Sequence, residues 1–155
     1  MFNIFKKSKG FASPFTGTIH AIAEAPDETF SSKTMGDGFF VTPTLGTVYA
    51  PADSTVTYIA DTHHALCLTT TDGTDYMLHI GINTVQLQGK GFTVNVADSQ
   101  HVKKGDVVMT FDAAYIRDYA KSDACLCIFT NLPEGKEIHL TATGNVRALD
   151  DVCTF

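Results

Sequence analysis

Apolar and polar residues alternate along short stretches of this chain, and turn-forming residues separate the stretches. A period of two residues is typical of strands that bury one face. The pattern predicts seven strands, at residues 17–23, 55–60, 64–71, 74–80, 106–111, 125–129 and 137–142. Between them stand turn signals rich in glycine, such as Asp72-Gly73 and Pro133-Glu134-Gly135.

One segment has a helical period instead. Residues 112–122, DAAYIRDYAKS, place Ala113, Ile116 and Ala120 on one face. Seven strands and one short helix predict an all-β fold, built as a single antiparallel β-sandwich or barrel-like domain.

Composition and charge narrow the class of protein. The chain has 155 residues, of which 44% are hydrophobic and 18% charged, as expected for one folded domain. Asp and Glu number 17 against 11 Lys and Arg, a formal charge of −6, which argues against nucleic-acid binding. No stretch approaches the roughly 20 apolar residues of a membrane span, so we expect no stable membrane insertion.

The four cysteines do not form a recognisable metal or redox motif. Cys125 and Cys127 stand in the run ACLCIFT, where C-x-C spacing puts both on one face of a strand. Zinc knuckles and redox sites use C-x-x-C. We therefore predict that these two and Cys67 and Cys153 are reduced, buried thiols of a cytosolic protein.

The candidate chemistry lies in residues 61–84, DTHHALCLTTTDGTDYMLHIGINT. Asp-Gly between two alternating runs is the strongest short-range signal for a β-hairpin. If Asp72 and Gly73 form a two-residue turn, Thr71 pairs with Thr74. All further pairs then have residue numbers that sum to 145.

That register brings two histidines together. It places Leu66 opposite His79, and His64 shares the face of Leu66. His64 is then a diagonal neighbour of His79, at about 7–8 Å between backbones, and His63 points to the other face. The prediction depends on the two-residue turn, because a bulge there would move one histidine to the opposite face.

Two neighbouring imidazoles allow three kinds of chemistry, and the residues alone leave all three open. Zinc needs three or four ligands, and no third ligand is evident in the sequence. Acid–base hydrolysis lacks a marked serine or cysteine nucleophile. Alternatively, one histidine accepts a phosphoryl group while the other donates a hydrogen bond to it. The remaining histidines, His20, His101 and His139, carry no comparable signal.

Landmarks through most of the chain resemble a known family, the glucose-type IIA (EIIA) component of the bacterial phosphoenolpyruvate-dependent sugar phosphotransferase system. They are SPFTGTI (13–19), MGDGFFVTP (35–43), APADSTV (50–56), THHAL (62–66), LHIGINTVQLQGKGF (78–92) and VKKGDVVMTFD (102–112). The resemblance implies a β-sandwich with a shallow site. It also implies a domain over residues 13–155, after a leader of residues 1–12.

In that family, the position of His79 accepts a phosphoryl group from the carrier protein HPr and passes it to a cysteine of a IIB domain. The resemblance implies that His64 and Thr62 hold the phosphoryl group. It implies a cytoplasmic protein with no organic cofactor, and weak zinc binding between His64 and His79 with help from a partner. We expect a neutral His79 ring near pH 7, fixed by a hydrogen bond at its other nitrogen.

Partner contacts are expected around this pair. Asn83 stands where the family usually has aspartate, which removes one negative charge and affects partner electrostatics. A regulatory role, binding target proteins without efficient phosphotransfer, is the alternative function. The resemblance and the chemistry of the residues together predict partner-binding positions at Asp37, Phe39, Phe40, Val41, Gly81 and Asn83.

Overall fold

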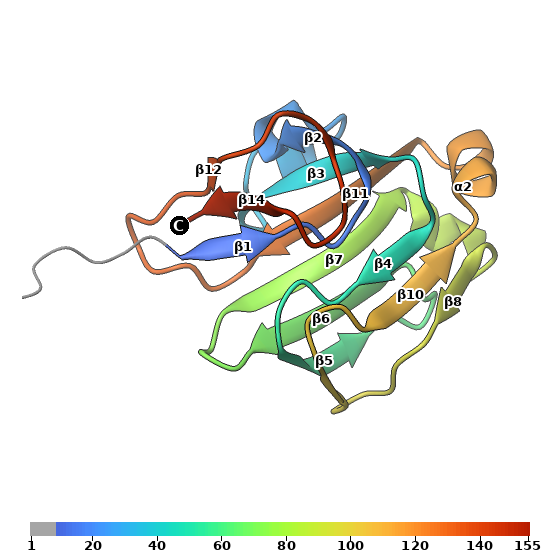
Figure 1. Ribbon diagram of the computed structural model, residues 1–155. Helices are drawn as coiled ribbons and strands as arrows, with labels where there is room; N and C mark the ends of the chain where they lie inside the picture. The colour runs from blue at the N-terminus through green and yellow to red at the C-terminus, as the bar shows by residue number, and fades with distance from the viewer. Residues whose placement is uncertain (1–8) are drawn as a thin grey trace, which may run out of the picture.

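The computed structural model describes residues 9–155 (Figure 1). Within them, short strands alternate with turns, as the hydropathy pattern predicts. The strands are β1 (Gly10–Ala12), β2 (Gly17–Ala21), β3 (Asp37–Pro43), β4 (Thr47–Tyr49), β5 (Ser54–Ile59), β6 (Ala65–Thr70), β7 (Asp75–Ile82), β8 (Phe92–Val94), β9 (His101–Val102), β10 (Val107–Phe111), β11 (Ser122–Phe129), β12 (His139–Leu140), β13 (Gly144–Val146) and β14 (Asp151–Thr154). The helices are α1 (Glu28–Ser31) and α2 (Ala113–Tyr119), with 3-10 turns η1 (Ile22–Glu24) and η2 (Thr84–Leu87).

The strands form one large sheet and two small ones, and the ladders are antiparallel. The large sheet has eight strands in the order β13-β2-β3-β11-β7-β6-β5-β9. The small sheets, β1-β14-β12 and β4-β10-β8, lie over one of its faces (Figure 1). This arrangement confirms the predicted all-β antiparallel fold. None of the helices within residues 9–155 is long and apolar enough to cross a membrane.

The large sheet buries both faces, and strand β7 contributes to each. Leu78 and Ile80 face the main core between the sheets, and neither is exposed. Met77 faces a second apolar cluster on the other side of the sheet, which also contains Phe30 of α1. Because side chains alternate along a strand, His79 lies on the side of Met77, where it contacts Phe30 of α1.

The C-x-C pair behaves as its spacing predicts. Cys125 and Cys127 both point into the main core and are fully buried. All four cysteines are free thiols, and burial raises the pKa of Cys153 to about 12. These thiols are protonated at neutral pH, so they are poor nucleophiles.

Within residues 9–155 the predicted helix is present in shortened form, as α2, and a second helix, α1, was missed. The predicted helix at residues 112–122 ends early, at Tyr119, and Ser122 already begins β11. The second helix, α1, has only four residues, too few for a hydrophobic period to reveal. Its N-cap is Asp27, whose side chain accepts a hydrogen bond from the Thr29 amide.

The N-terminal boundary lies earlier than predicted. Strand β1 covers Gly10–Ala12 and pairs with β14, so these three residues belong to the sheet and not to a separate leader. The rest of the predicted leader, residues 1–8, lies outside the described residues.

The β6–β7 hairpin differs from the predicted register by one residue. Ala65, not Leu66, lies opposite His79, so paired residue numbers sum to 144. The Thr70 amide donates to the Thr74 carbonyl at 2.9 Å, leaving a three-residue loop. The prediction of a two-residue Asp-Gly turn, with Thr71 opposite Thr74, is therefore wrong.

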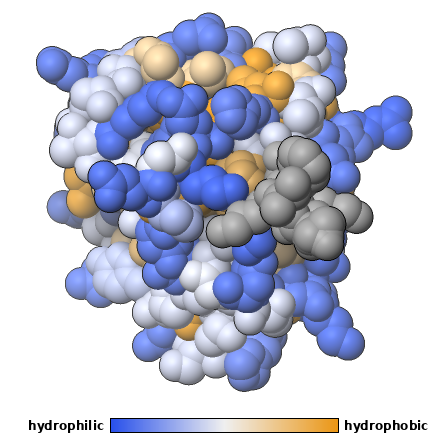
Figure 2. Space-filling view, turned by 90° about the vertical axis from the view of Figure 1, so that its left-hand side faces the viewer, coloured by the Kyte–Doolittle hydropathy of each residue, from blue (hydrophilic) through white to orange (hydrophobic). Residues whose placement is uncertain are grey.

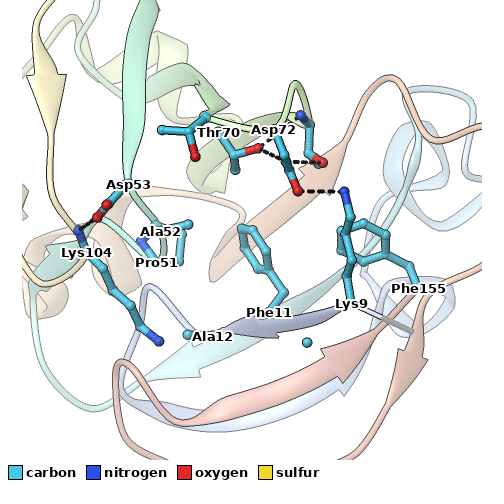
Figure 3. Close-up of a pocket in the computed structure, with 13 residues that line it drawn as sticks. Lys9, Phe11, Ala12, Pro51, Ala52, Asp53, Thr70, Asp72, Lys104 and Phe155 are labelled. Atoms are coloured by element: carbon cyan, nitrogen blue, oxygen red, sulfur yellow. Dashed lines mark hydrogen bonds and ion pairs between the residues drawn. The ribbon is translucent and has the colours of Figure 1, made fainter. Parts of the chain in front are cut away.

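Side-chain bonds to Asp72 explain the longer loop. Its carboxylate accepts hydrogen bonds from the hydroxyls of Thr70 and Thr74 and from the Lys9 amino group (Figure 3). Gly73 follows with φ +92°, the left-handed conformation typical of the last residue in such loops. This end of the molecule presents a mostly hydrophilic surface (Figure 2).

Candidate functional site

The histidine pair lies at the opposite end of the hairpin from this loop, in a shallow depression of about 190 Å³. Three separate segments build it: the start of α1, the turn before β6, and the end of β7 leading into η2. The residues that line it are Asp27, Thr29, Phe30, His64, His79, Asn83, Thr84 and Val85.

The rings of His64 and His79 lie side by side, with centroids 4.9 Å apart and planes at 81°. The predicted pairing is therefore present, although the predicted register is not. In the observed register, strand alternation alone would send His64 towards the main core with Leu66. The exposed His63 has φ +61°, so the chain turns just before β6 and directs the His64 ring to His79 instead.

Thr62 lies next to His64, as the resemblance implies. Its hydroxyl and Nδ1 of His64 are 2.7 Å apart. Burial lowers the pKa of His64, so the ring is neutral at pH 7. When the hydroxyl donates to Nδ1, the ring proton is on Nε2, which makes Nε2 a hydrogen-bond donor.

His79 has a defined tautomer because of one backbone contact. Its Nδ1 lies 2.8 Å from the carbonyl oxygen of Gly81. A carbonyl can only accept, so Nδ1 carries the proton, and Nε2 of the neutral ring has a free lone pair.

The pKa of His79 is lowered to about 4. Burial is the largest cause and the neighbouring His64 adds to it, while the Gly81 carbonyl and Asp27 act in the opposite direction. His79 is therefore neutral at pH 7, as expected, with a pKa well below that of an ordinary histidine.

Phe30 and Asp27 belong to the site, and the sequence analysis missed both. The Phe30 ring packs against His79 with centroids 5.0 Å apart, and Phe30 is 8% exposed. Asp27 is the N-cap of α1 and lies 3.8 Å from the Lys121 amino group. The only signal in the sequence was the capping aspartate two residues before Thr29, because α1 is too short to show a period.

Gly81 and Asn83 have left-handed backbones, with φ of +74° and +62°. Gly81, a predicted partner-binding position, has no open space beside it: a Cβ there would lie 2.5 Å from Cγ2 of Thr84 and 3.0 Å from a methyl of Ile116. Gly81 is thus required by its conformation, not by a partner's approach. Asn83 is exposed and lines the depression, where a partner can reach it.

The predicted partner contacts in β3 are mostly internal. Phe39 and Val41 are fully buried in the main core, so the prediction that they contact partners is wrong. Phe40 is 6% exposed and stacks beneath His20, with centroids 4.7 Å apart. The family resemblance suggested that these residues contact partners, but the large sheet is covered on both faces.

Asp37 has a structural role at the start of β3. Its carboxylate accepts hydrogen bonds from the amides of Gly38 and Ile138 and lies 3.6 Å from the Lys33 amino group. It does not line the depression around the histidines. Its bond to Ile138 connects β3 to the C-terminal segment.

The donor set of the site does not suit a resident metal. His64 and His79 supply two nitrogen ligands, whereas zinc takes three or four protein ligands. Within residues 9–155 no group of three or more His, Cys, Asp or Glu side chains is placed to hold a metal ion.

Comparison with known proteins agrees with this fold. The family model described as phosphoenolpyruvate-dependent sugar phosphotransferase system, EIIA 1, matches residues 9–134. The structure is similar to the glucose permease IIA from Mycoplasma capricolum, with 33% sequence identity, 99% coverage of each chain and a TM-score of 0.89. The chain therefore belongs to the EIIA 1 family of the phosphoenolpyruvate-dependent sugar phosphotransferase system, as a glucose-type IIA component.

Proposed function

We propose that this protein is a cytoplasmic phosphocarrier. It accepts a phosphoryl group from phosphorylated HPr on Nε2 of His79 and passes it to a cysteine of a IIB domain during sugar uptake. The observation that carries the proposal is the bond from Nδ1 of His79 to the Gly81 carbonyl, because it leaves Nε2 as the nucleophilic nitrogen.

Acceptance is a displacement at phosphorus. The Nε2 lone pair forms the new N–P bond. The N–P bond of phosphorylated HPr breaks at the same time, and its electrons return to the histidine ring of HPr. No proton has to leave His79 first, since a ring with a pKa of about 4 is already neutral at pH 7. In the second transfer a cysteine thiolate attacks phosphorus, an S–P bond forms, and the Nε2–P electrons return to His79.

The phosphorylated ring keeps its proton on Nδ1 and becomes an imidazolium. The Gly81 carbonyl stabilises that N–H, and burial disfavours the ring's positive charge. Loss of the phosphoryl group returns the ring to its neutral form, so burial favours onward transfer. The low pKa of the free ring thus keeps His79 nucleophilic for acceptance, and burial of the imidazolium favours delivery.

His64, oriented by Thr62, provides a hydrogen-bond donor for the phosphoryl oxygens. With Thr62 donating to Nδ1, Nε2–H of His64 is available beside His79. A positioned donor stabilises negative charge that develops on the transferring group. His64 is neutral, so it donates a hydrogen bond without attracting the group so strongly that release becomes slow.

The surroundings suit a site that two partners cover in turn. The depression is shallow, and Phe30 and the 53% exposed Val85 give it apolar margins. A docked partner excludes water there, which protects the N–P bond from hydrolysis. The net charge of −6 favours encounter with a partner that presents a basic surface, and this attraction weakens as salt rises.

Phosphorylation with phosphoenolpyruvate, enzyme I and HPr, followed by intact-mass measurement, tests the proposal. Wild type is expected to gain one acid-labile phosphoryl group, and His79→Ala none. His64→Ala is expected to accept the group and to transfer it slowly to a IIB domain. If wild type gains no mass, the carrier function is wrong and the alternative of a regulatory binding module takes its place.

A further inference from the structure

The chain reverses direction immediately after His79. Gly81 and Asn83 both have positive φ, and the reversal carries Thr84 back onto the end of β7. Glycine and asparagine are the residues that adopt this conformation at least cost. The run HIGINT is therefore a compact turn whose last residue returns to the strand that bears the nucleophile.

Thr84 makes two contacts from this position, and none of its surface is exposed. Its hydroxyl donates to the carbonyl oxygen of Ile80 at 2.7 Å. Its Cγ2 methyl packs against Gly81, 2.5 Å from where a Cβ of that residue would stand. One side chain thus contacts both residues that follow His79.

The amide of Ile80 is held as well. It donates to the carbonyl oxygen of His64 at 2.8 Å. Ile80 is therefore fixed through its N–H by the second histidine's backbone and through its carbonyl by Thr84. Little freedom is left for the backbone that leads from His79 to Gly81.

A bulge in β11 lies opposite Gly81. Ile80 pairs with Cys125 and Ile82 with Ser122, so two residues of β11 face the single residue Gly81. A bulge interrupts the ladder locally. The Gly81 carbonyl turns to Nδ1 of His79, and its direction depends on the contacts that hold Ile80 and Gly81.

We propose that Thr84 is a positioning residue for His79. Its hydroxyl holds the Ile80 carbonyl, and the Gly81 carbonyl consequently stays aimed at Nδ1, which keeps the proton there and leaves Nε2 as the acceptor. The inference rests on the proposed function for its consequence in phosphotransfer, but the tautomer is a property of the unphosphorylated protein.

Two substitutions separate the hydroxyl from the methyl. Thr84→Val keeps the shape and removes the donor, and Thr84→Ser keeps the donor and removes the methyl. The readout is the tautomer of His79 at pH 7, from the 15N shifts of its ring nitrogens. Wild type and Thr84→Ser are expected to show one tautomer, protonated at Nδ1, and Thr84→Val a mixture. Phosphoryl acceptance by Thr84→Val should fall on the order of tenfold, with most of the rate retained in Thr84→Ser.

A single Nδ1–H tautomer in folded Thr84→Val would overturn the inference. If Thr84→Val does not fold, Thr84→Ser and Thr84→Ala make the same comparison in a smaller side chain. One tautomer in serine and a mixture in alanine would support the role of the hydroxyl, and identical spectra would overturn it. Wild type that shows the single tautomer but accepts no phosphoryl group would refute the carrier function and leave the positioning role intact.

Discussion

Nδ1 of His79 donates a hydrogen bond to the carbonyl oxygen of Gly81, two residues further along the same strand, at 2.8 Å. This bond decides which ring nitrogen is free. It also makes the chemistry depend on a backbone conformation, φ +74°, that glycine adopts readily and other residues rarely adopt. The site is thus sensitive to changes in the backbone as well as in the histidines.

Gly81→Ala should therefore be strongly destabilising. The new Cβ would lie 2.5 Å from the Thr84 methyl and 3.1 Å from the Ser122 carbonyl oxygen, in addition to the strain of positive φ. We expect the free energy of unfolding, from urea denaturation, to fall by about 3 kcal/mol. Gly73→Ala is the control, since φ there is +92° but nothing lies within 4 Å. It should cost only about 1 kcal/mol. Equal losses at the two positions would refute the role of close packing.

Stability should fall in mild acid because of His79. Its folded pKa of about 4 lies below the unfolded value of about 6.5, so the unfolded chain takes up the proton first as pH falls. The contribution is fully present above pH 6.5 and is lost progressively down to pH 4. Its size is at most about 3 kcal/mol.

The measurement is urea denaturation of wild type and His79→Gln between pH 4.5 and 7.5. Glutamine does not titrate in this range, so the free energy of unfolding of the variant should depend less steeply on pH. Some slope should persist, because burial also lowers the pKa of His64. Identical slopes in the two proteins would show that His79 does not have the lowered pKa.

Phe30→Ala should raise the pKa of His79. The Phe30 ring lies 5.0 Å from the imidazole and helps to keep water from it, and burial is the main cause of the low pKa. An NMR titration should show the pKa moving from about 4 towards 6.5. In phosphorylated protein, hydrolysis of the N–P bond should accelerate.

Phe155→Ala is the matched control for Phe30→Ala. Phe155 is a partly buried phenylalanine that packs against Phe11 and Phe129, away from the depression. Its loss should lower stability and leave the His79 titration unchanged. An equal pKa change in both variants would point to general loosening of the fold.

Asn83→Asp should also raise the pKa of His79, through charge instead of exposure. It adds a carboxylate to the lining of the depression, where Asp27 already acts in that direction. Aspartate tolerates the left-handed φ of +62°, so the fold should be retained.

Gln86→Glu makes the same change of charge on an exposed residue that does not line the depression. The pKa of His79 should rise more in Asn83→Asp than in Gln86→Glu by NMR titration. With HPr as donor, phosphoryl acceptance by Asn83→Asp should also show a steeper dependence on salt. Equal pKa changes would mean that long-range charge, not placement in the depression, sets the effect.

Much of the fold was predictable because a few neighbouring residues are enough to show the alternation that marks a strand and its two faces. Alternation located most strands of the large sheet and placed Cys125 and Cys127 on one face. The short helix α1 was missed, since four residues cannot show a period. The burial of β3 was also missed: the motif MGDGFFVTP suggested partner contacts there, but it does not reveal that both faces of the sheet are covered, as they are at Phe39 and Phe40.

The sequence by itself determined the all-β class, and through its motifs it identified the family and the pair His64 and His79. Tertiary structure alone decided how that pair is made and which nitrogen is free. The register depends on the side chains that hydrogen-bond to Asp72, the direction of His64 on the left-handed backbone of His63, and the tautomer of His79 on the Gly81 carbonyl. Each of these is settled by contacts or backbone angles that alternation of residue types does not encode.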